Sequence, residues 1–196
     1  MDCILLKNGY DTDKLIQDYK IAEYYHKFIN PDNFKGNSFV ISDETHGWEA
    51  IPLHTIDGIE GNKGTIPKNI DNNIFKPNNT LLKCKYFQEI LDELNTEIYL
   101  VRIMKLKTGG YIAPHIDKYI NDKDKIIRCQ IPILTSKEVD FYFGNKKYYL
   151  ESGNLYFLNV GEVEHYVRNN SKIDRITLVI DLKPSSSIKK IINYPF

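Results

Sequence analysis

The sequence predicts a mainly β protein, a jelly roll with N-terminal helices packed on one face. The first half carries two amphipathic helical patterns, and the second half carries at least seven short runs of β-branched and aromatic residues separated by turn residues. Short strands at this spacing are typical of antiparallel sandwiches and barrels, and helices can cover one face of such a sheet. The chain has 196 residues and shows no repeat or linker, so we expect one domain over residues 1–196.

The two helices are predicted from apolar residues that recur every three or four positions. This spacing runs through residues 13–30, where Asn30-Pro31 closes the pattern, and through residues 85–95. The other elements expected in this half are strands at 38–43 and 48–53 and a long loop at 57–80, rich in Gly, Asn, Pro and Asp.

Apolar runs bounded by turn residues predict the strands of the barrel. They lie at 97–106, 126–134, 139–143, 146–151, 154–159, 165–169 and 175–181. Gly144-Asn145 forms a hairpin turn between two of them, and the glycine pair at 109–110 is interpreted as a turn after the first. We therefore expect the β core at 97–182, supporting helices and strands in 1–96, and a peripheral tail at 183–196.

Composition narrows the classes of function. Lys+Arg and Asp+Glu both number 26, and this zero net charge gives no support for binding nucleic acid or a membrane surface. No apolar run is long enough to span a membrane, and the N-terminal residues lack the basic region of a secretory signal. The three cysteines show no CxxC spacing, which fits a reducing compartment. We expect a cytoplasmic protein.

Two of the five histidines stand out because of their neighbours. His115 and Asp117 are one residue apart in PHID, so the alternation of an extended segment places both on one face. His165 follows 50 residues after His115, across several predicted strands. Two imidazoles and one carboxylate on one face of a metal leave other coordination positions open, an arrangement typical of non-haem Fe(II) oxygenases.

The other histidines are weaker candidates for a site. His26 lies in a helical pattern of mixed polarity and is expected at the surface or in packing. His46 and His54 flank the strand predicted at 48–53. Either could line a cleft, although packing is the simpler interpretation.

Two arginines indicate that a molecule with a carboxylate could bind near the metal. Arg175 begins the last predicted strand, ten residues after His165. A guanidinium inside a barrel can bind a carboxylate through two parallel hydrogen bonds, whereas without the metal ligands a surface arginine would be the simpler reading. In IIRCQIPI, alternation places Arg128 and Gln130 on one face and the apolar residues on the other. Such a strand would suit a barrel whose lumen holds a dicarboxylate.

These motifs together resemble a known family. From Trp48 to Asp181 the chain is similar to the aspartyl/asparaginyl β-hydroxylase-like branch of the Fe(II)/2-oxoglutarate-dependent oxygenases. The matching segments, in order, are WEAIPL, YLVRIMKLKTGGYIAPHID, RCQIPILT and VDFYFGNKKYYLESGNLYFLNVGEVEHYVRNNSKIDRITLVID. They cover about two-thirds of the chain, and the ordered set is far more specific than any single motif.

The resemblance implies a double-stranded β-helix of the cupin-like type, with iron held by His115, Asp117 and His165. It implies that 2-oxoglutarate chelates the iron while its distal carboxylate meets Arg175, and that Arg128, the family's second arginine, faces this cosubstrate. Relatives often carry His at the position of Gln130. The animal members that act on growth-factor-like domains lack the ligand carboxylate. The presence of Asp117 therefore makes the chain more similar to the smaller microbial members.

The resemblance further implies a dioxygenase that uses Fe(II), 2-oxoglutarate and O2 to hydroxylate an unactivated C–H bond of an amino acid, releasing succinate and CO2. The substrate would be a free amino acid or an Asp/Asn-type residue in a peptide or protein. From their place in the sequence, Trp48 and His54 precede the barrel and could line the substrate side, and Arg102, on the strand leading to His115, could bind a substrate or cosubstrate carboxylate. Two alternatives remain open at this point. A non-catalytic cupin-like protein that binds a metal or ligand would not need Arg175. A zinc hydrolase would need a general base, which no HExxH motif supplies.

Overall fold

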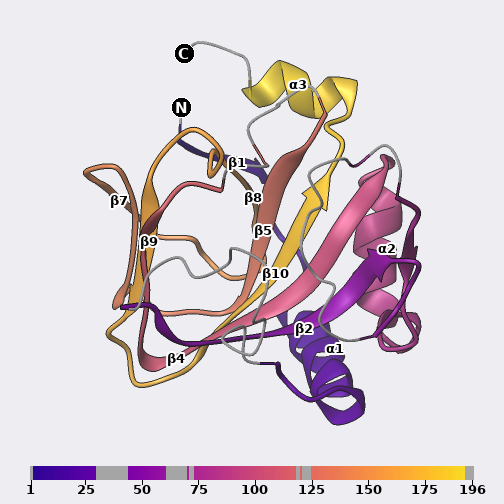
Figure 1. The fold of residues 1–196 in the computed structure, drawn as a ribbon, viewed down its shortest axis with the longest axis horizontal. Coiled ribbons are helices and arrows are strands. Elements are labelled where there is room, and N and C mark those ends of the chain that lie inside the picture. The colour runs from indigo at the N-terminus through magenta and orange to yellow at the C-terminus, as the bar shows by residue number, and fades with distance from the viewer. Residues whose placement is uncertain are drawn as a thin grey trace.

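The computed structural model describes residues 2–29, 44–60, 70, 73–117, 120 and 125–192. Over these residues the fold is mainly β, and one sheet curls toward a barrel with helices on its outside (Figure 1). The predicted fold class, a double-stranded β-helix with N-terminal helices on one face, is confirmed.

The sheet is antiparallel, and its strands are far from sequence order. The described strands are β1 (Cys3–Lys7), β2 (His46–Ile56), β3 (Phe75–Pro77), β4 (Ile98–His115), β5 (Ile127–Leu134), β6 (Val139–Phe143), β7 (Lys146–Tyr148), β8 (Leu155–Leu158), β9 (His165–Asn169) and β10 (Arg175–Leu182). They pair in the order β1-β8-β5-β10-β4-β9-β6-β7, and β2 adds to β4 and carries β3. The described helices are α1 (Thr12–Tyr25), α2 (Lys85–Glu93), α3 (Ser186–Ile192) and the short 3-10 helix η2 (Leu81–Lys83).

Strand β4 joins the two halves of the barrel. Its first part pairs with β10 and β2, and its last part pairs with β9. The turn expected at the glycine pair is therefore wrong, because the strand continues through it to His115. Gly109 has a φ of 75°, and a Cβ on Gly110 would lie 2.7 Å from Cδ1 of Leu106, so glycine lets the strand bend here without ending.

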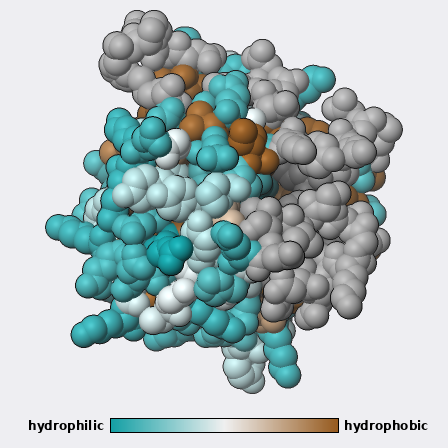
Figure 2. All heavy atoms as spheres, turned by 60° about the vertical axis from the view of Figure 1, so that its left-hand side comes forward, coloured by the Kyte–Doolittle hydropathy of each residue, from teal (hydrophilic) through white to brown (hydrophobic). Residues whose placement is uncertain are grey.

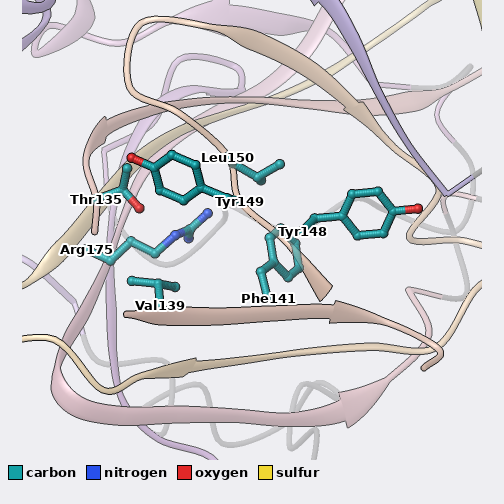
Figure 3. A pocket seen from close by; sticks show the side chains of 7 residues that line it. All are labelled: Thr135, Val139, Phe141, Tyr148, Tyr149, Leu150 and Arg175. Carbon is teal, nitrogen blue, oxygen red and sulfur yellow. The ribbon is translucent and has the colours of Figure 1, made fainter. Parts of the chain in front are cut away.

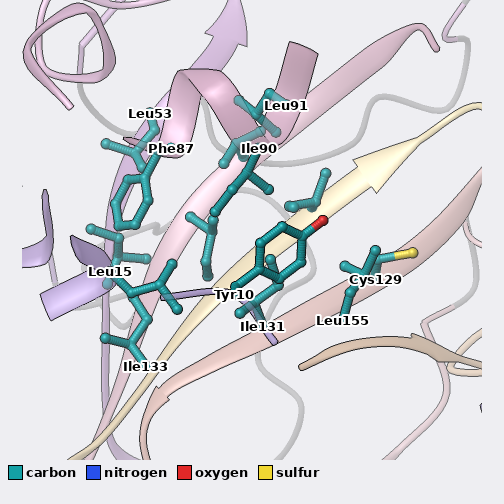
Figure 4. Close-up of a cluster of buried hydrophobic side chains, with 14 of the residues drawn as sticks. Tyr10, Leu15, Leu53, Phe87, Ile90, Leu91, Cys129, Ile131, Ile133 and Leu155 are labelled. Carbon is teal, nitrogen blue, oxygen red and sulfur yellow. The ribbon is translucent and has the colours of Figure 1, made fainter. Parts of the chain in front are cut away.

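The main core lies between the sheet and the helices. Side chains that face outward from β5 and β10 pack with apolar residues of α1 and α2 (Figure 4). The alternation predicted for IIRCQIPI is confirmed in this cluster, which contains Ile127, Cys129, Ile131 and Ile133. Asp11 caps α1 by accepting hydrogen bonds from the backbone N–H groups of Asp13 and Lys14. The helix ends at Tyr25, earlier than the predicted boundary, and Ile29 pairs with Ala50 of β2 instead.

A second apolar cluster lines the inside of the barrel. Its aromatic members Phe141 and Phe143 come from β6, and Leu158 and Tyr156 come from β8. Because the outward positions of β5 and β10 are apolar and the inward positions are largely polar, the lumen combines apolar walls with charged groups from these two strands. The lumen is therefore where the candidate site residues meet.

Two elements near the ends of the described chain were missing from the prediction. β1 pairs with β8 and extends the sheet at its edge. The supposed tail contains α3, whose Ile188 and Ile192 are buried in the main core, so the expectation of a peripheral segment is wrong (Figure 1). Both runs, CILLK and SSIKKII, are too short for a periodic pattern to identify them.

The remaining predicted elements stand as follows. The helix at 85–95 and the strands from 126 onward are found within one to three residues of their expected ends, and the strand at 48–53 is the centre of a longer β2. The loop at 57–80 contains β3, and the strand at 38–43 lies outside the described residues. Where the structure describes the chain, none of its helices has the length and apolar character needed to cross a membrane. The side on which β7 and β9 lie is largely hydrophilic (Figure 2).

Candidate metal centre and cosubstrate pocket

The three predicted metal ligands meet at the junction of β4 and β9. His115 and His165 are directly paired across these strands, and their ring centroids lie 4.2 Å apart. Asp117 follows β4, and its backbone N–H donates to the carbonyl of Val160 over 2.9 Å, which fixes the turn at this point. One ligand atom from each of the three residues lies within 4.8 Å of the others, so the group could hold one metal ion.

Backbone carbonyls determine which nitrogen each histidine offers. Nδ1 of His115 lies 2.8 Å from the carbonyl oxygen of Ala113, and Nδ1 of His165 lies 3.2 Å from that of Val163. A carbonyl oxygen can only accept, so Nδ1 carries the proton in both rings and Nε2 presents its lone pair. This is the state in which neutral imidazole binds a metal, and it fits a metal held by the two Nε2 atoms.

The ligand carboxylate is ionised. Burial alone would raise the pKa of Asp117, but the charges of Arg128, His165 and His115 hold this pKa below its usual range. Burial and the neighbouring His115 lower the pKa of His165 to about 4, so this imidazole is neutral at pH 7. Two imidazoles and one ionised carboxylate form a donor set that suits Fe(II) with positions left open.

Arg175 is a buried cation in the lumen. Its side chain projects from the start of β10, and the residue is 5% exposed. Among the described residues it makes no ion pair with a carboxylate, unlike Arg102 and Arg128. Burial lowers the pKa of Arg175 to about 10, so the guanidinium still carries its charge at pH 7. A buried charge without a counter-ion is costly, which indicates that a bound anion completes this site.

A small recess opens beside this guanidinium. It is lined by Thr135, Tyr148, Tyr149, Leu150, Val139, Phe141 and Arg175. Figure 3 shows the guanidinium between Tyr149 and Thr135 on one side and Val139 and Phe141 on the other. The recess is too narrow for a water molecule as its side chains stand, and its lining combines hydroxyl groups and one cation with apolar side chains.

One aromatic ring connects the recess to the metal cluster. The guanidinium carbon of Arg175 lies 5.5 Å from the ring centroid of Phe141, and the same ring lies 6.5 Å from the ring of His165. Arg175 and the metal ligands are therefore separated by about one side chain.

Gln130 and Arg128 both lie on the lumen face of β5, as predicted, but they have different partners. Nη2 of Arg175 donates to Oε1 of Gln130 over 3.1 Å. Arg128 instead donates through Nη1 to Oδ2 of Asp117, and through Nε and Nη2 to Asp181. Burial opposes the charge on Arg128, but the two carboxylates raise its pKa above the ordinary value.

The three candidates for substrate binding are not gathered in one place. Arg102 is in the lumen, where Nη1 donates to Asp181 over 3.0 Å. Trp48 is partly buried on β2 and packs against the inner cluster. His54, on the same strand, is held by Nδ1 against the carbonyl of Tyr99 over 2.8 Å, and burial lowers its pKa. His46 and His26 are outside the metal cluster, in agreement with the simpler interpretation.

Two lumen residues escaped the sequence prediction. Asp181 is fully buried between Arg102 and Arg128, and the hydroxyl of Thr177 is buried without a hydrogen-bond partner among the described residues. Both have the same parity as Arg175 in RITLVIDL, so the alternation that separated Arg128 from its apolar neighbours would also have placed them inside.

Comparison with known proteins identifies the family. Residues 19–184 match the family model described as aspartyl/asparaginyl beta-hydroxylase, which is most of the chain. The chain belongs to this family. It is therefore a 2-oxoglutarate-dependent hydroxylase that uses Fe(II), 2-oxoglutarate and O2, and the non-catalytic alternative is not supported.

Solved structures share the hydroxylase fold at low sequence identity. A prolyl hydroxylase from Trichoplax adhaerens, in complex with a peptide fragment of hypoxia-inducible factor, aligns with a TM-score of 0.58 at 12% identity, over 99% of this chain and 88% of that one. A prolyl-4-hydroxylase from Pseudomonas putida aligns with a TM-score of 0.55 at 10% identity, over 94% of both chains. HygX from Streptomyces hygroscopicus, with nickel, 2-oxoglutarate and hygromycin B bound, aligns with a TM-score of 0.54 at 7% identity, over 94% of this chain and 84% of that one.

Proposed function

We propose that this hydroxylase acts on an unactivated C–H bond of an amino acid, either free or as an Asp/Asn-type residue in a peptide or protein. The observation that carries the assignment is Arg175, a buried cation that lacks a carboxylate partner among the described residues and lines a recess one side chain away from the His-Asp-His cluster. This is the arrangement that a metal-chelating dicarboxylate cosubstrate requires.

The roles of the site residues follow from their contacts. His115, Asp117 and His165 hold the metal, and Arg175 binds the distal carboxylate of 2-oxoglutarate. The metal with this cosubstrate and O2 supplies the oxidising chemistry that hydroxylates the substrate, with succinate and CO2 released. Gln130 supports the orientation of Arg175 through its hydrogen bond. Arg128 retains two of its five N–H groups beyond those given to Asp117 and Asp181, so it can also face the cosubstrate.

The apolar walls of the lumen contribute by excluding water. Phe141 and Phe143 lie against His165, with ring centroids 6.5 and 5.4 Å from the imidazole. In a site shielded from solvent, the charge of Arg175 attracts a carboxylate more strongly than it would in water. The protein thus provides orientation and a dry cavity, while the metal supplies reactivity.

Among the candidates for substrate binding, Arg102 has the best support. It places a charged group in the lumen, and its charge contributes to the low pKa of Asp117, so it lies within electrostatic range of the metal cluster. Trp48 and His54 lie on β2, the strand beside β4, and would form the flank of the same opening.

The three cysteines support a cytoplasmic location. Cys3, Cys84 and Cys129 are all free thiols, and the last two are buried in the core. A protein of a reducing compartment keeps such thiols unpaired.

The test is anaerobic addition of Fe(II) and 2-oxoglutarate to the purified protein. A weak visible charge-transfer band is expected when both are present, and it should be absent with either alone. Succinate release in air is then screened with the free amino acids, followed by short peptides with a central Asp or Asn. Succinate formed with a free amino acid identifies the first substrate class, and succinate formed only with peptides identifies the second. The proposal fails if neither the band nor succinate appears.

A further inference from the structure

Asp181 is a buried carboxylate to which the proposed reaction gives no role. It lies on the lumen face of β10 and is 0% exposed. Both of its oxygens accept hydrogen bonds: Oδ1 from Nε of Arg128 over 2.6 Å, and Oδ2 from Nη2 of Arg128 and Nη1 of Arg102, each over 3.0 Å. Such a carboxylate is fixed in position by two cations from two neighbouring strands.

The contact with Arg128 determines how that guanidinium is turned. Two parallel hydrogen bonds from Nε and Nη2 to one carboxylate define the plane of the guanidinium as well as its position. This leaves Nη1 at the opposite end of the group, where it donates to Oδ2 of Asp117. Asp181 and Asp117 therefore hold the two ends of one planar group.

The orientation of Arg128 affects the metal ligand Asp117. Oδ2 of Asp117 is occupied by Arg128, while Oδ1 is the oxygen that faces His115, 3.8 Å from its Nε2. Oδ1 is then the better-placed ligand atom, because the charge-assisted hydrogen bond from Arg128 competes with a metal for Oδ2. An aspartate that binds through one oxygen uses one coordination position, whereas binding through both oxygens would occupy a position that the cosubstrate or O2 needs.

The charges of the group balance. Arg102 and Arg128 face Asp117 and Asp181, so two cations meet two carboxylates in the buried interior. Arg102 pairs with Asp181, and in this group its charge balances the second carboxylate. The connection from Asp181 to the metal ligand runs through Arg128.

We propose that Asp181 is a positioning residue for the metal centre, because it orients Arg128 so that Asp117 binds the metal through Oδ1 only. This inference rests on the proposed metal ligands. It goes beyond them by assigning a fourth and a fifth residue to the geometry of the centre, neither of which touches the metal.

The test measures binding of Co(II) alone, without cosubstrate, in two variants. Asp181→Asn keeps the size of the side chain but offers an amide donor to an arginine that needs an acceptor. Arg128→Lys keeps the charge near Asp117 but cannot reach both carboxylates with one fixed plane. In each variant the dissociation constant for Co(II) should rise by about 10-fold to 100-fold, the range found when groups behind metal ligands are removed. The Co(II) absorption spectrum should change as the coordination of Asp117 changes.

Arg128→Lys separates positioning from simple electrostatics, because its net charge is that of the parent protein. The matched control is Asp140→Asn, which removes a carboxylate that pairs with Lys147 outside the metal cluster. It should leave Co(II) affinity unchanged. Far-ultraviolet circular dichroism and urea unfolding verify that each variant is folded, and if Asp181→Asn does not fold, Arg128→Lys carries the test.

Failure of the positioning role and failure of the metal site give different results. If Arg128→Lys and a folded Asp181→Asn bind Co(II) as tightly as the parent, with the same spectrum, the positioning role is overturned. If His115→Ala also binds Co(II) like the parent, the metal site itself is wrong.

Discussion

The amide oxygen of Gln130 accepts a hydrogen bond from Nη2 of Arg175, 3.1 Å away, inside the barrel between β5 and β10. This hydrogen bond brings Gln130 into direct contact with the arginine proposed to bind the cosubstrate. A neutral acceptor orients the guanidinium without neutralising it, so the charge remains available to an anion.

Gln130→Glu should therefore weaken binding of 2-oxoglutarate. The new carboxylate would pair with Arg175 in nearly the same space and repel the cosubstrate, a loss on the order of 2 kcal/mol or about 30-fold in Kd. Isothermal titration with 2-oxoglutarate in the presence of Mn(II) and absence of O2 measures it. Gln88→Glu is the control, because Gln88 is on α2 and donates to a carbonyl of its own helix. Equal affinities for the Gln130 variant and the parent would mean that Arg175 does not bind the cosubstrate.

Arg175→Lys should also weaken binding of 2-oxoglutarate, for a different physical reason. Lysine keeps the positive charge but replaces a planar pair of donors by a point charge, and loss of a charge-assisted hydrogen bond amounts to about 1.5–3 kcal/mol. The same titration, with Arg168→Lys on the exposed side of β9 as control, gives the comparison. Unchanged cosubstrate affinity would remove Arg175 from the site.

His115→Ala and His165→Ala should each abolish Fe(II)-dependent turnover of 2-oxoglutarate. Each removes one of two imidazole ligands, and the remaining donors cannot hold the metal in the same geometry. Succinate formation is the measurement, and His26→Ala, outside the metal cluster, is the control. Turnover that persists in either variant would exclude that histidine from the ligand set.

Ile188→Ala should destabilise the whole domain, although the residue lies in the supposed tail. Its side chain is 8% exposed and packs in the main core, so truncation should lower the free energy of unfolding by about 2–4 kcal/mol. Ile191→Ala, on the exposed side of α3, should change it by less than about 0.5 kcal/mol. Urea unfolding compares the two. Similar small effects in both would show that α3 does not contribute to the core.

The sequence was most informative where strand alternation and chemistry coincide. His115 and Asp117 could be assigned to one face of their segment, and Arg128 and Gln130 to one face of theirs, from parity and residue type alone, because a strand exposes alternate residues to opposite sides. The pairing of His115 with His165 needed more, since it depends on the antiparallel neighbour of β4, which the order of strands in the sequence does not reveal.

The errors have specific physical causes. The glycines at 109 and 110 are equally compatible with a turn and with a bend inside a strand, and only packing of Leu106 against Gly110 distinguishes them. α3 has one short apolar face that gains its stability from the core rather than from its own sequence. Asp181 was overlooked because its role depends on ion pairs with Arg102 and Arg128, and these residues lie on other strands.

The hydrogen bonds from Nδ1 of His115 and His165 have a consequence for engineering. The Nδ1 proton of each imidazole is held by a carbonyl of its own chain two residues earlier, and among the described residues no side chain makes that contact. Nearby side chains can therefore be exchanged without changing which nitrogen each ring presents. A library that randomises the lumen to seek new substrates could keep a correctly prepared pair of imidazoles in every member whose strands remain paired.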